Sequence, residues 1–144
     1  MDQFKIIFSQ WTDIETHAKL IRSQVFIQEQ NIPEEDEWDE QDAISLHFVI
    51  YDVSTDSKNP IATARLLPNN SVGRVAVLKE YRGQGVGRLI MQKVIEQAKL
   101  EKRAWLKLSS QVHAIQFYES LGFNKQGTEY LDCGIPHIDM MMTL

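Results

Sequence analysis

One segment of the chain combines positive charge with unusual backbone freedom. In "VLKEYRGQGVGR" (Val77–Arg88), three glycines fall within five residues and arginines flank them. Glycine allows a backbone to approach a ligand without a Cβ clash. A helix that begins near Val86 adds unpaired N–H groups and the positive end of its dipole. The segment is therefore predicted to bind an anion, for which a pyrophosphate is suited. The alternative is a tight strand-to-helix turn in which the glycines serve geometry alone.

The spacing of these glycines excludes two common nucleotide loops. A P-loop requires Gly-Lys-Ser/Thr after its first glycine, and no such string occurs here. In the dinucleotide pattern G-x-G-x-x-G, the third glycine would fall where Arg88 stands. A nucleotide-binding module is therefore disfavoured.

The same segment resembles the signature of the GNAT superfamily of acyl-CoA-dependent N-acetyltransferases. The pattern [Gln/Arg]-x-x-Gly-x-[Gly/Ala] is met by Arg82–Gly87, and "AIQFYESLGF" (Ala114–Phe123) resembles the second motif of the family. "VFIQEQNIPEEDEWDE" and "LDCGIPHIDMM" are further similar to its ElaA-like and YjcF-like bacterial branch. The resemblance covers essentially the whole chain and implies a single GNAT domain over residues 1–144.

The resemblance also implies a site for acetyl-CoA as co-substrate. The pantetheine arm would pair with a strand at Val75 and Val77, in a gap where that strand splays from the one carrying Lys107–Ser109. A backbone N–H near Val77 would polarise the thioester carbonyl. Gln111 stands where many members have an asparagine that contacts the pantetheine. The backbone N–H groups expected to hold the pyrophosphate belong to Arg82, Gly83, Gln84, Gly85, Val86, Gly87 and Arg88.

The implied reaction moves an acetyl group from the thioester to a primary amine by direct attack. The departing thiolate needs a proton donor, and Tyr118 is the candidate because a phenol stays protonated at neutral pH. Glu29 is the candidate base, with His113, His137 or a water chain as alternatives. Each of these residues also has a structural interpretation, such as core packing for Tyr118 and a solvated helix end for Glu29. Phe117 is expected to face the core on the opposite side from Tyr118.

The alternative function is a non-catalytic CoA-binding sensor or interaction module.

Composition limits the classes of partner. The chain has 144 residues, 43% of them hydrophobic, and a net charge of −5, which disfavours nucleic-acid binding. No apolar run is long enough for a membrane helix. Cys133 is the only cysteine, so no intrachain disulfide can form, which fits the cytoplasm. We expect Cys133 to be a small, partly buried hydrophobe rather than a nucleophile. No metal site is predicted.

The net charge conceals an acidic segment. Eight acidic residues and no basic ones fall between Glu29 and Asp42, a stretch predicted to be a loop. This loop either lines the acceptor side, where it would suit a cationic small-molecule or peptide amine, or is simply solvated. Trp38 is unusual in a solvated loop and is expected to fold onto the cleft or a partner subunit. The second alternative would require a homodimer.

Hydrophobic periodicity predicts the elements that must position these residues. A helix is expected over 13–29, with a capping box from Thr12 to Glu15, and a second over 86–101. A short helix over 113–122 would close at Gly122. Strands are expected over 4–8, 45–53, 60–67, 74–78, 104–110, 123–126 and 135–143, the last one packed in the core. This order predicts an α/β (α+β) fold with a mixed, mostly antiparallel sheet flanked by helices. The resemblance adds splayed central strands.

Overall fold

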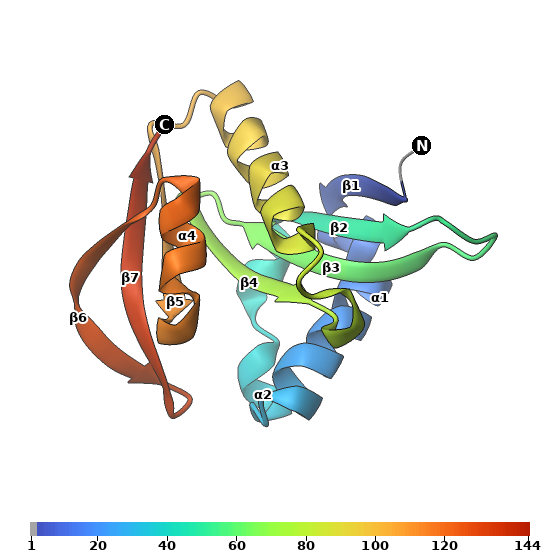
Figure 1. The fold of residues 1–144 in the computed structure, drawn as a ribbon, viewed down its shortest axis with the longest axis horizontal. Helices are drawn as coiled ribbons and strands as arrows, with labels where there is room; N and C mark the ends of the chain where they lie inside the picture. The colour runs from blue at the N-terminus through green and yellow to red at the C-terminus, as the bar shows by residue number, and fades with distance from the viewer. Residues whose placement is uncertain (1–2) are drawn as a thin grey trace.

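A computed structural model describes residues 3–144 and shows one seven-stranded sheet in the order β1-β2-β3-β4-β5-β7-β6 (Figure 1). All neighbours are antiparallel except β4 and β5, which run parallel. The strands are β1 (Phe4–Gln10), β2 (Leu46–Asp52), β3 (Asn59–Leu66), β4 (Ser71–Val77), β5 (Trp105–Gln111), β6 (Asn124–Asp132) and β7 (Ile135–Thr143). The helices are α1 (Trp11–Arg22), α2 (Glu34–Glu37), α3 (Val86–Leu100) and α4 (Ile115–Leu121), and α1 continues as a π-helix over Ser23–Glu29. Short 3-10 turns cover Glu40–Ile44, Lys79–Tyr81 and Val112–Ala114.

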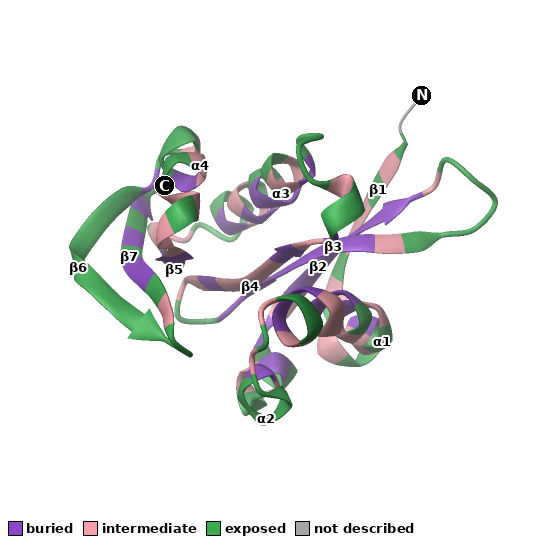
Figure 2. Cartoon of the chain, turned by 60° about the horizontal axis from the view of Figure 1, so that its bottom comes forward, coloured by how far each residue is buried: buried purple, intermediate pink, exposed green. Residues whose placement is uncertain are grey.

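Helices cover the two faces of the sheet. Figure 2 shows α1 and α2 on one side of β2–β4 and α3 on the other. Ile14, Ala18 and Ile21 recur at helical spacing and are buried, as periodicity predicts, while Ile90 and Val94 anchor α3. Strands β2 and β3 lie between these two layers and are buried along most of their length, whereas β6 is exposed throughout. The predicted mixed fold is confirmed.

The central strands β4 and β5 separate after a short contact. Only Ser71 pairs with Lys107 and Val72 with Leu108. Beyond Val72, β4 carries a bulge against β3, and Arg74 there has a left-handed φ of 51°. The predicted splay is thus present, and it opens the sheet at its centre.

Three local predictions need correction. Helix α1 begins at Trp11 directly after β1, with Gln10 at the N-cap and no side-chain cap bond, so the Thr12–Glu15 capping box does not form. The predicted loop after Glu29 contains α2 and a 3-10 turn. The strand expected over 123–126 extends to Asp132, because it pairs along β7 across a bulge. Gly122 does end α4, with a φ of 110°.

Strand β7 packs in the core as expected, since Met140 and Met142 are buried. Within residues 3–144, no helix is long and apolar enough to span a membrane.

Candidate active site

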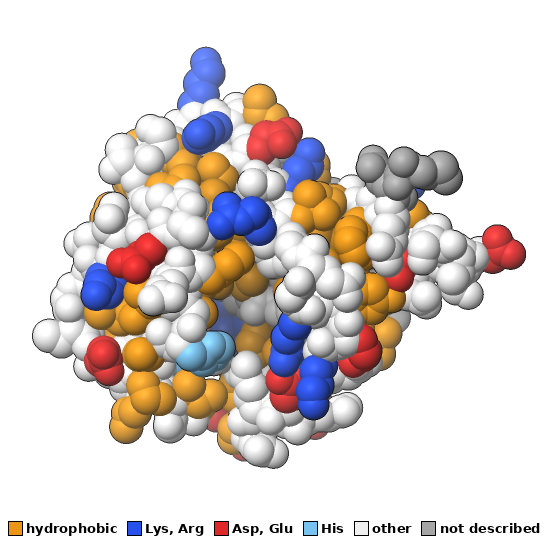
Figure 3. Space-filling view, viewed as in Figure 1, with side chains coloured by type: hydrophobic (Ala, Val, Ile, Leu, Met, Phe, Trp, Pro, Cys, Tyr) orange, Lys and Arg blue, Asp and Glu red, His pale blue; other side chains and the backbone are white. Residues whose placement is uncertain are grey.

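A cavity of about 1000 Å³ occupies the gap between β4 and β5. It is lined by β4 over Gly73–Val77 and by β5 at Lys107–Ser109 and Gln111. The π-helical turn, α4 and β7 supply further walls, at Glu29, Tyr118 and Asp139 among others. Figure 3 shows the surface hollowed at this position, with hydrophobic side chains around much of the opening. The predicted residues Val75, Val77, Arg82, Gln111 and Tyr118 all line this one cavity.

The glycine-rich loop follows Arg82, which lines the cavity, and leads into α3, whereas the predicted residues Gly83, Gln84, Gly85, Val86, Gly87 and Arg88 do not line the cavity. Gly83 and Gly85 have φ values of 77° and 80°, in the left-handed region that favours glycine, and Gly85 is the N-cap of α3. Nothing lies within 4 Å of a Cβ built on either residue. No side-chain bond caps this helix end, so the N–H groups of its first turn are available to an anion.

The third glycine of the loop has a different role. Gly87 is helical, and a Cβ there would lie 3.4 Å from the ring of Phe117. Gly87 therefore allows α3 to approach α4 closely. Phe117 itself lines the cavity next to Tyr118, with ring centroids 5.0 Å apart, so the expectation that it faces the opposite side is wrong.

A tyrosine just before the loop fixes its position. The Tyr81 hydroxyl donates a 2.5 Å hydrogen bond to Asp52 at the end of β2. This bond, with further bonds from Ser54, lowers the pKa of Asp52 to about 2. The residue before Arg82 is thus bonded to the end of β2, which fixes the start of the glycine-rich loop.

Glu29 and Arg82 face each other at the edge of the cavity. Arg82 donates to both carboxylate oxygens of Glu29, at 2.5 and 2.8 Å, and both side chains are substantially exposed. The hydrogen bond from Arg82 and its charge lower the pKa of Glu29. In this pairing Glu29 is a weaker base than a free glutamate. Arg88 is held by Ser120, at 2.5 Å.

Tyr118 is a buried tyrosine at the cavity. Its side chain is only 9% exposed, and burial raises the pKa of its hydroxyl to about 12. Among residues 3–144, no side chain or backbone group forms a hydrogen bond with this hydroxyl, although it lies at the cavity. The hydroxyl stays protonated at neutral pH, and its hydrogen is available to form a hydrogen bond with a ligand.

A short chain of polar side chains reaches Gln111. Its amide donates to Gln30 at 3.0 Å and accepts from His113 at 2.7 Å. His137 donates from Nδ1 to the carbonyl of Ile135 at 2.7 Å. Both histidines line the cavity, so the predicted alternatives to Glu29 are present there.

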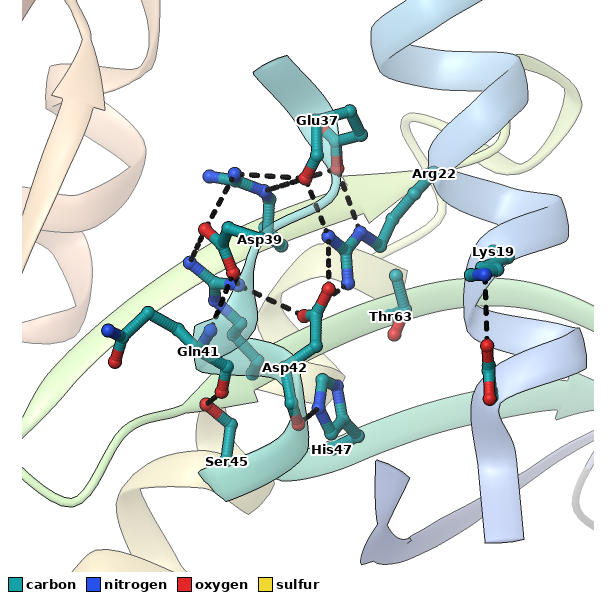
Figure 4. Close-up of polar contacts among 12 residues, drawn as sticks. Lys19, Arg22, Glu37, Asp39, Gln41, Asp42, Ser45, His47 and Thr63 are labelled. Carbon is teal, nitrogen blue, oxygen red and sulfur yellow. Dashed lines mark hydrogen bonds and ion pairs between the residues drawn. The ribbon is translucent and has the colours of Figure 1, made fainter. Parts of the chain in front are cut away.

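A buried ion-pair network holds the acidic segment and was not predicted (Figure 4). Arg22 is 1% exposed and bonds Glu37 and Asp42, each at 2.8 Å. Arg65 bonds Asp39 at 2.7 Å and Asp42 at 3.0 Å, while Arg74 reaches Glu37 and Asp39. Three arginines therefore neutralise the central carboxylates of the segment, whereas its other acidic residues at 34–36 and 40 are exposed and form no ion pair in the part of the chain that the structure describes. Of these, Asp36 lines the cavity. The available signal was Arg65, which stands within a mostly apolar strand.

The carboxylates of the network respond differently to burial. Burial alone raises the pKa of Asp42, but the hydrogen bonds and charges of Arg22 and Arg65 outweigh it, so the pKa lies below its ordinary value. Asp39 shows the same direction for the same reason, with Arg65 and Arg74 as its partners. For Glu37, burial outweighs the neighbouring arginines and raises the pKa.

Trp38 packs over Arg22, with the guanidinium 5.0 Å from the ring, and does not line the cavity, so the first of its two predicted positions is wrong. The prediction for Cys133 is also wrong. Cys133 is exposed at the turn between β6 and β7 rather than partly buried. Among the described residues, no group of three His, Cys, Asp or Glu side chains could hold a metal ion.

Comparison with known proteins identifies the family. Residues 18–144 match the acetyltransferase (GNAT) domain. The chain belongs to the GNAT acetyltransferase family. It is 38% identical over 129 residues to YjcF of Bacillus subtilis, described as an uncharacterized N-acetyltransferase, covering 86% of this chain and 89% of YjcF. The crystal structure of Escherichia coli ElaA superposes with a TM-score of 0.84 at 26% identity, over 96% of this chain and 99% of that one.

The fold is also that of a GNAT family acetyltransferase from Elizabethkingia anophelis solved with acetyl-CoA bound. That structure has a TM-score of 0.71 at 14% identity and covers 100% of both chains. The resemblance inferred from the two motifs is thus confirmed, and the chain is an acyltransferase of the GNAT type. Members of this family act on small-molecule or peptide amines.

Proposed function

We propose that this protein transfers an acetyl group from acetyl-CoA to a primary amine by direct attack of the amine on the thioester. The observation that carries the proposal is the cavity at the β4–β5 splay, which is lined by Tyr118 and by Arg82, the residue before the glycine-rich loop. We also propose a cytoplasmic location, which a single cysteine fits.

The residues present fit coenzyme A. In the proposal, backbone N–H groups from Arg82 to Arg88 hold the pyrophosphate, as the left-handed Gly83 and Gly85 allow. Val75, Val77 and Gln111 line the path of the pantetheine. Bound in this way, acetyl-CoA supplies the activated acyl group. No metal is invoked.

Three groups would then act on the reaction. A backbone N–H near Val77 stabilises the oxyanion, and Tyr118 gives its proton to the departing thiolate. Glu29 takes the proton of the amine. It becomes a better base if Arg82 turns toward the pyrophosphate, because the arginine is what lowers the pKa of Glu29.

A thiol-release assay with a panel of amines, run with acetyl-CoA and a longer acyl-CoA, tests the reaction. Calorimetry with acetyl-CoA, ATP and NAD on the same preparation tests the ligand. We expect acetyl-CoA alone to bind and at least one amine to accelerate thiol release. Binding of acetyl-CoA without turnover on any amine would instead support a CoA-binding sensor, and preferential binding of ATP or NAD would overturn the proposal.

A further inference from the structure

Three side chains on adjacent strands form a hydrogen-bonded cluster at one wall of the cavity. They are Ser109 on β5, Asp139 on β7 and Tyr130 on β6, hereafter the Ser109–Tyr130–Asp139 cluster. Ser109 and Asp139 are register partners, and both line the cavity. The Tyr130 hydroxyl donates to Asp139 Oδ1 at 2.6 Å and also bonds Ser109 Oγ. His137 stacks on the Tyr130 ring, with centroids 6.2 Å apart, and so keeps the ring in place.

The direction of these bonds determines what the cluster can bind. Tyr130 has one hydroxyl hydrogen, and Asp139 receives it, so Ser109 must be the donor to Tyr130. Both hydroxyl hydrogens are then used. What remains toward the cavity is the second oxygen of Asp139 and the lone pairs of Ser109. The cluster therefore offers only acceptors and one negative charge, which suits a cationic donor.

The charge of Asp139 is also uncompensated. Across residues 3–144, Asp139 forms no ion pair, whereas Glu37, Asp39 and Asp42 each pair with arginine. Lys107 projects from the same face of β5, but its ammonium lies over the Trp105 ring, 5.7 Å from the centroid. Asp36 and Asp132 also line the cavity without an ion pair to any described residue, but Asp139 is the one whose carboxylate is fixed by a tyrosine hydroxyl on the wall formed by β5 and β7.

We propose that this cluster binds a second, non-reacting ammonium group of the acceptor, which makes aliphatic diamines and polyamines the preferred substrate class. Asp139 lies on β7, one strand away from the splay, and its register partner Ser109 is the first β5 residue beyond the last β4–β5 pair. An ammonium held by Asp139 is therefore not the amine that reacts at the splay. The inference rests on the proposed amine acetylation, whose acceptor class it specifies.

The test compares putrescine with n-butylamine, which has the same carbon chain but only one ammonium. We expect wild-type kcat/KM to favour putrescine by about tenfold or more, beyond the advantage of its two identical amino groups. Asp139→Asn removes the charge in the same shape and is expected to abolish that preference, while n-butylamine turnover and CoA affinity are kept. Asp56→Asn, in the exposed β2–β3 turn, is the matched control and keeps the preference. A putrescine preference that survives in Asp139→Asn overturns the inference.

Calorimetric titration of putrescine into the CoA-saturated protein separates this inference from the proposed function. Binding that is lost in Asp139→Asn, without turnover, supports the ammonium site and refutes the acetylation of this amine. Turnover of amines without any preference for putrescine supports the reaction and overturns the ammonium site. Absence of putrescine binding in the wild type overturns the ammonium site in either case.

Discussion

Two sets of arginines in this protein differ in how firmly they are held. Arg22 and Arg65 are buried and bonded to carboxylates from the segment between α2 and β2. Arg82 and Arg88 lie at the anion loop, and each has one exposed side-chain partner, Glu29 or Ser120. A buried arginine cannot give up its carboxylates without leaving uncompensated charge. An exposed arginine can exchange its partner for a ligand at little cost.

The difference assigns the two sets to different tasks. The buried set holds the segment that contributes Asp36 and Glu37 to the cavity wall, and the exposed set is the one that we propose for the pyrophosphate. Arg74 lies between these extremes, since it belongs to the network but also lines the cavity.

The largest effect is expected at Arg22. Arg22→Met removes the guanidinium and leaves Glu37 and Asp42 buried without it, so we expect a loss of about 3–5 kcal/mol in the free energy of unfolding. Urea denaturation measures it. Arg88→Met makes the same replacement at the exposed loop and is expected to cost about 0.5 kcal/mol or less. Similar losses in the two variants would remove the distinction between the sets.

The next effect concerns turnover and not stability. Tyr118→Phe removes a hydroxyl without a protein partner, so we expect kcat to fall about 100-fold with CoA affinity and unfolding free energy nearly unchanged. Because the pKa of Tyr118 is about 12, wild-type activity is not expected to decline through its ionisation below about pH 11. Steady-state kinetics across pH, with calorimetry for CoA, checks both points. Full activity of the variant on an accepted amine would show that Tyr118 is not the acid.

Gly85→Val tests the anion loop. Valine at a φ of 80° is strained, and we expect a loss of about 1–2 kcal/mol in unfolding free energy together with loss of CoA binding. Gly127→Val is a matched control in the β6 bulge, with a φ of 75° and equally open surroundings. It should carry similar strain and bind CoA normally. Unchanged CoA affinity in Gly85→Val would separate the loop from the cofactor.

The smallest effect is expected at Glu29. Glu29→Gln frees Arg82, so we expect CoA to bind about two- to fivefold more tightly, with less than about 1 kcal/mol lost in unfolding free energy. Since the folded-state pKa of Glu29 is lowered, its contribution to stability is present above its unfolded pKa of about 4.3 and is lost as pH falls through the folded value. Denaturation of both proteins between neutral and acid pH checks the direction. Weaker CoA binding in the variant would contradict the exchange of partners.

Much of the molecule was predictable because the signals are local. The spacing of Ile14, Ala18 and Ile21 specifies one helical face, and the alternation in "HIDMMM" specifies one strand face. The glycines on either side of Gln84 indicate a tight turn before a helix. Two sequence motifs were enough to indicate the family. Each of these features depends on a few consecutive residues, so it can be read without knowing what packs against them.

The remaining features depend on contacts between distant segments. A carboxylate is solvated, buried in an ion pair or free to bind a ligand according to its surroundings, and the sequence contains the same residue type in all three cases. Thus the acidic run at 34–42 looks like a cationic-substrate wall, yet Arg22 and Arg65 from other elements neutralise its centre. Asp139 lies alone in an apolar strand, yet pairing of β5, β7 and β6 brings it to Ser109 and Tyr130 on the cavity wall. The sequence was enough to predict most of the elements, the glycine turn before α3 and the family. Only the tertiary structure shows which charged side chains are paired within the fold and which remain unpaired at the cavity. Burial and contacts between distant segments set the free energy of each charge.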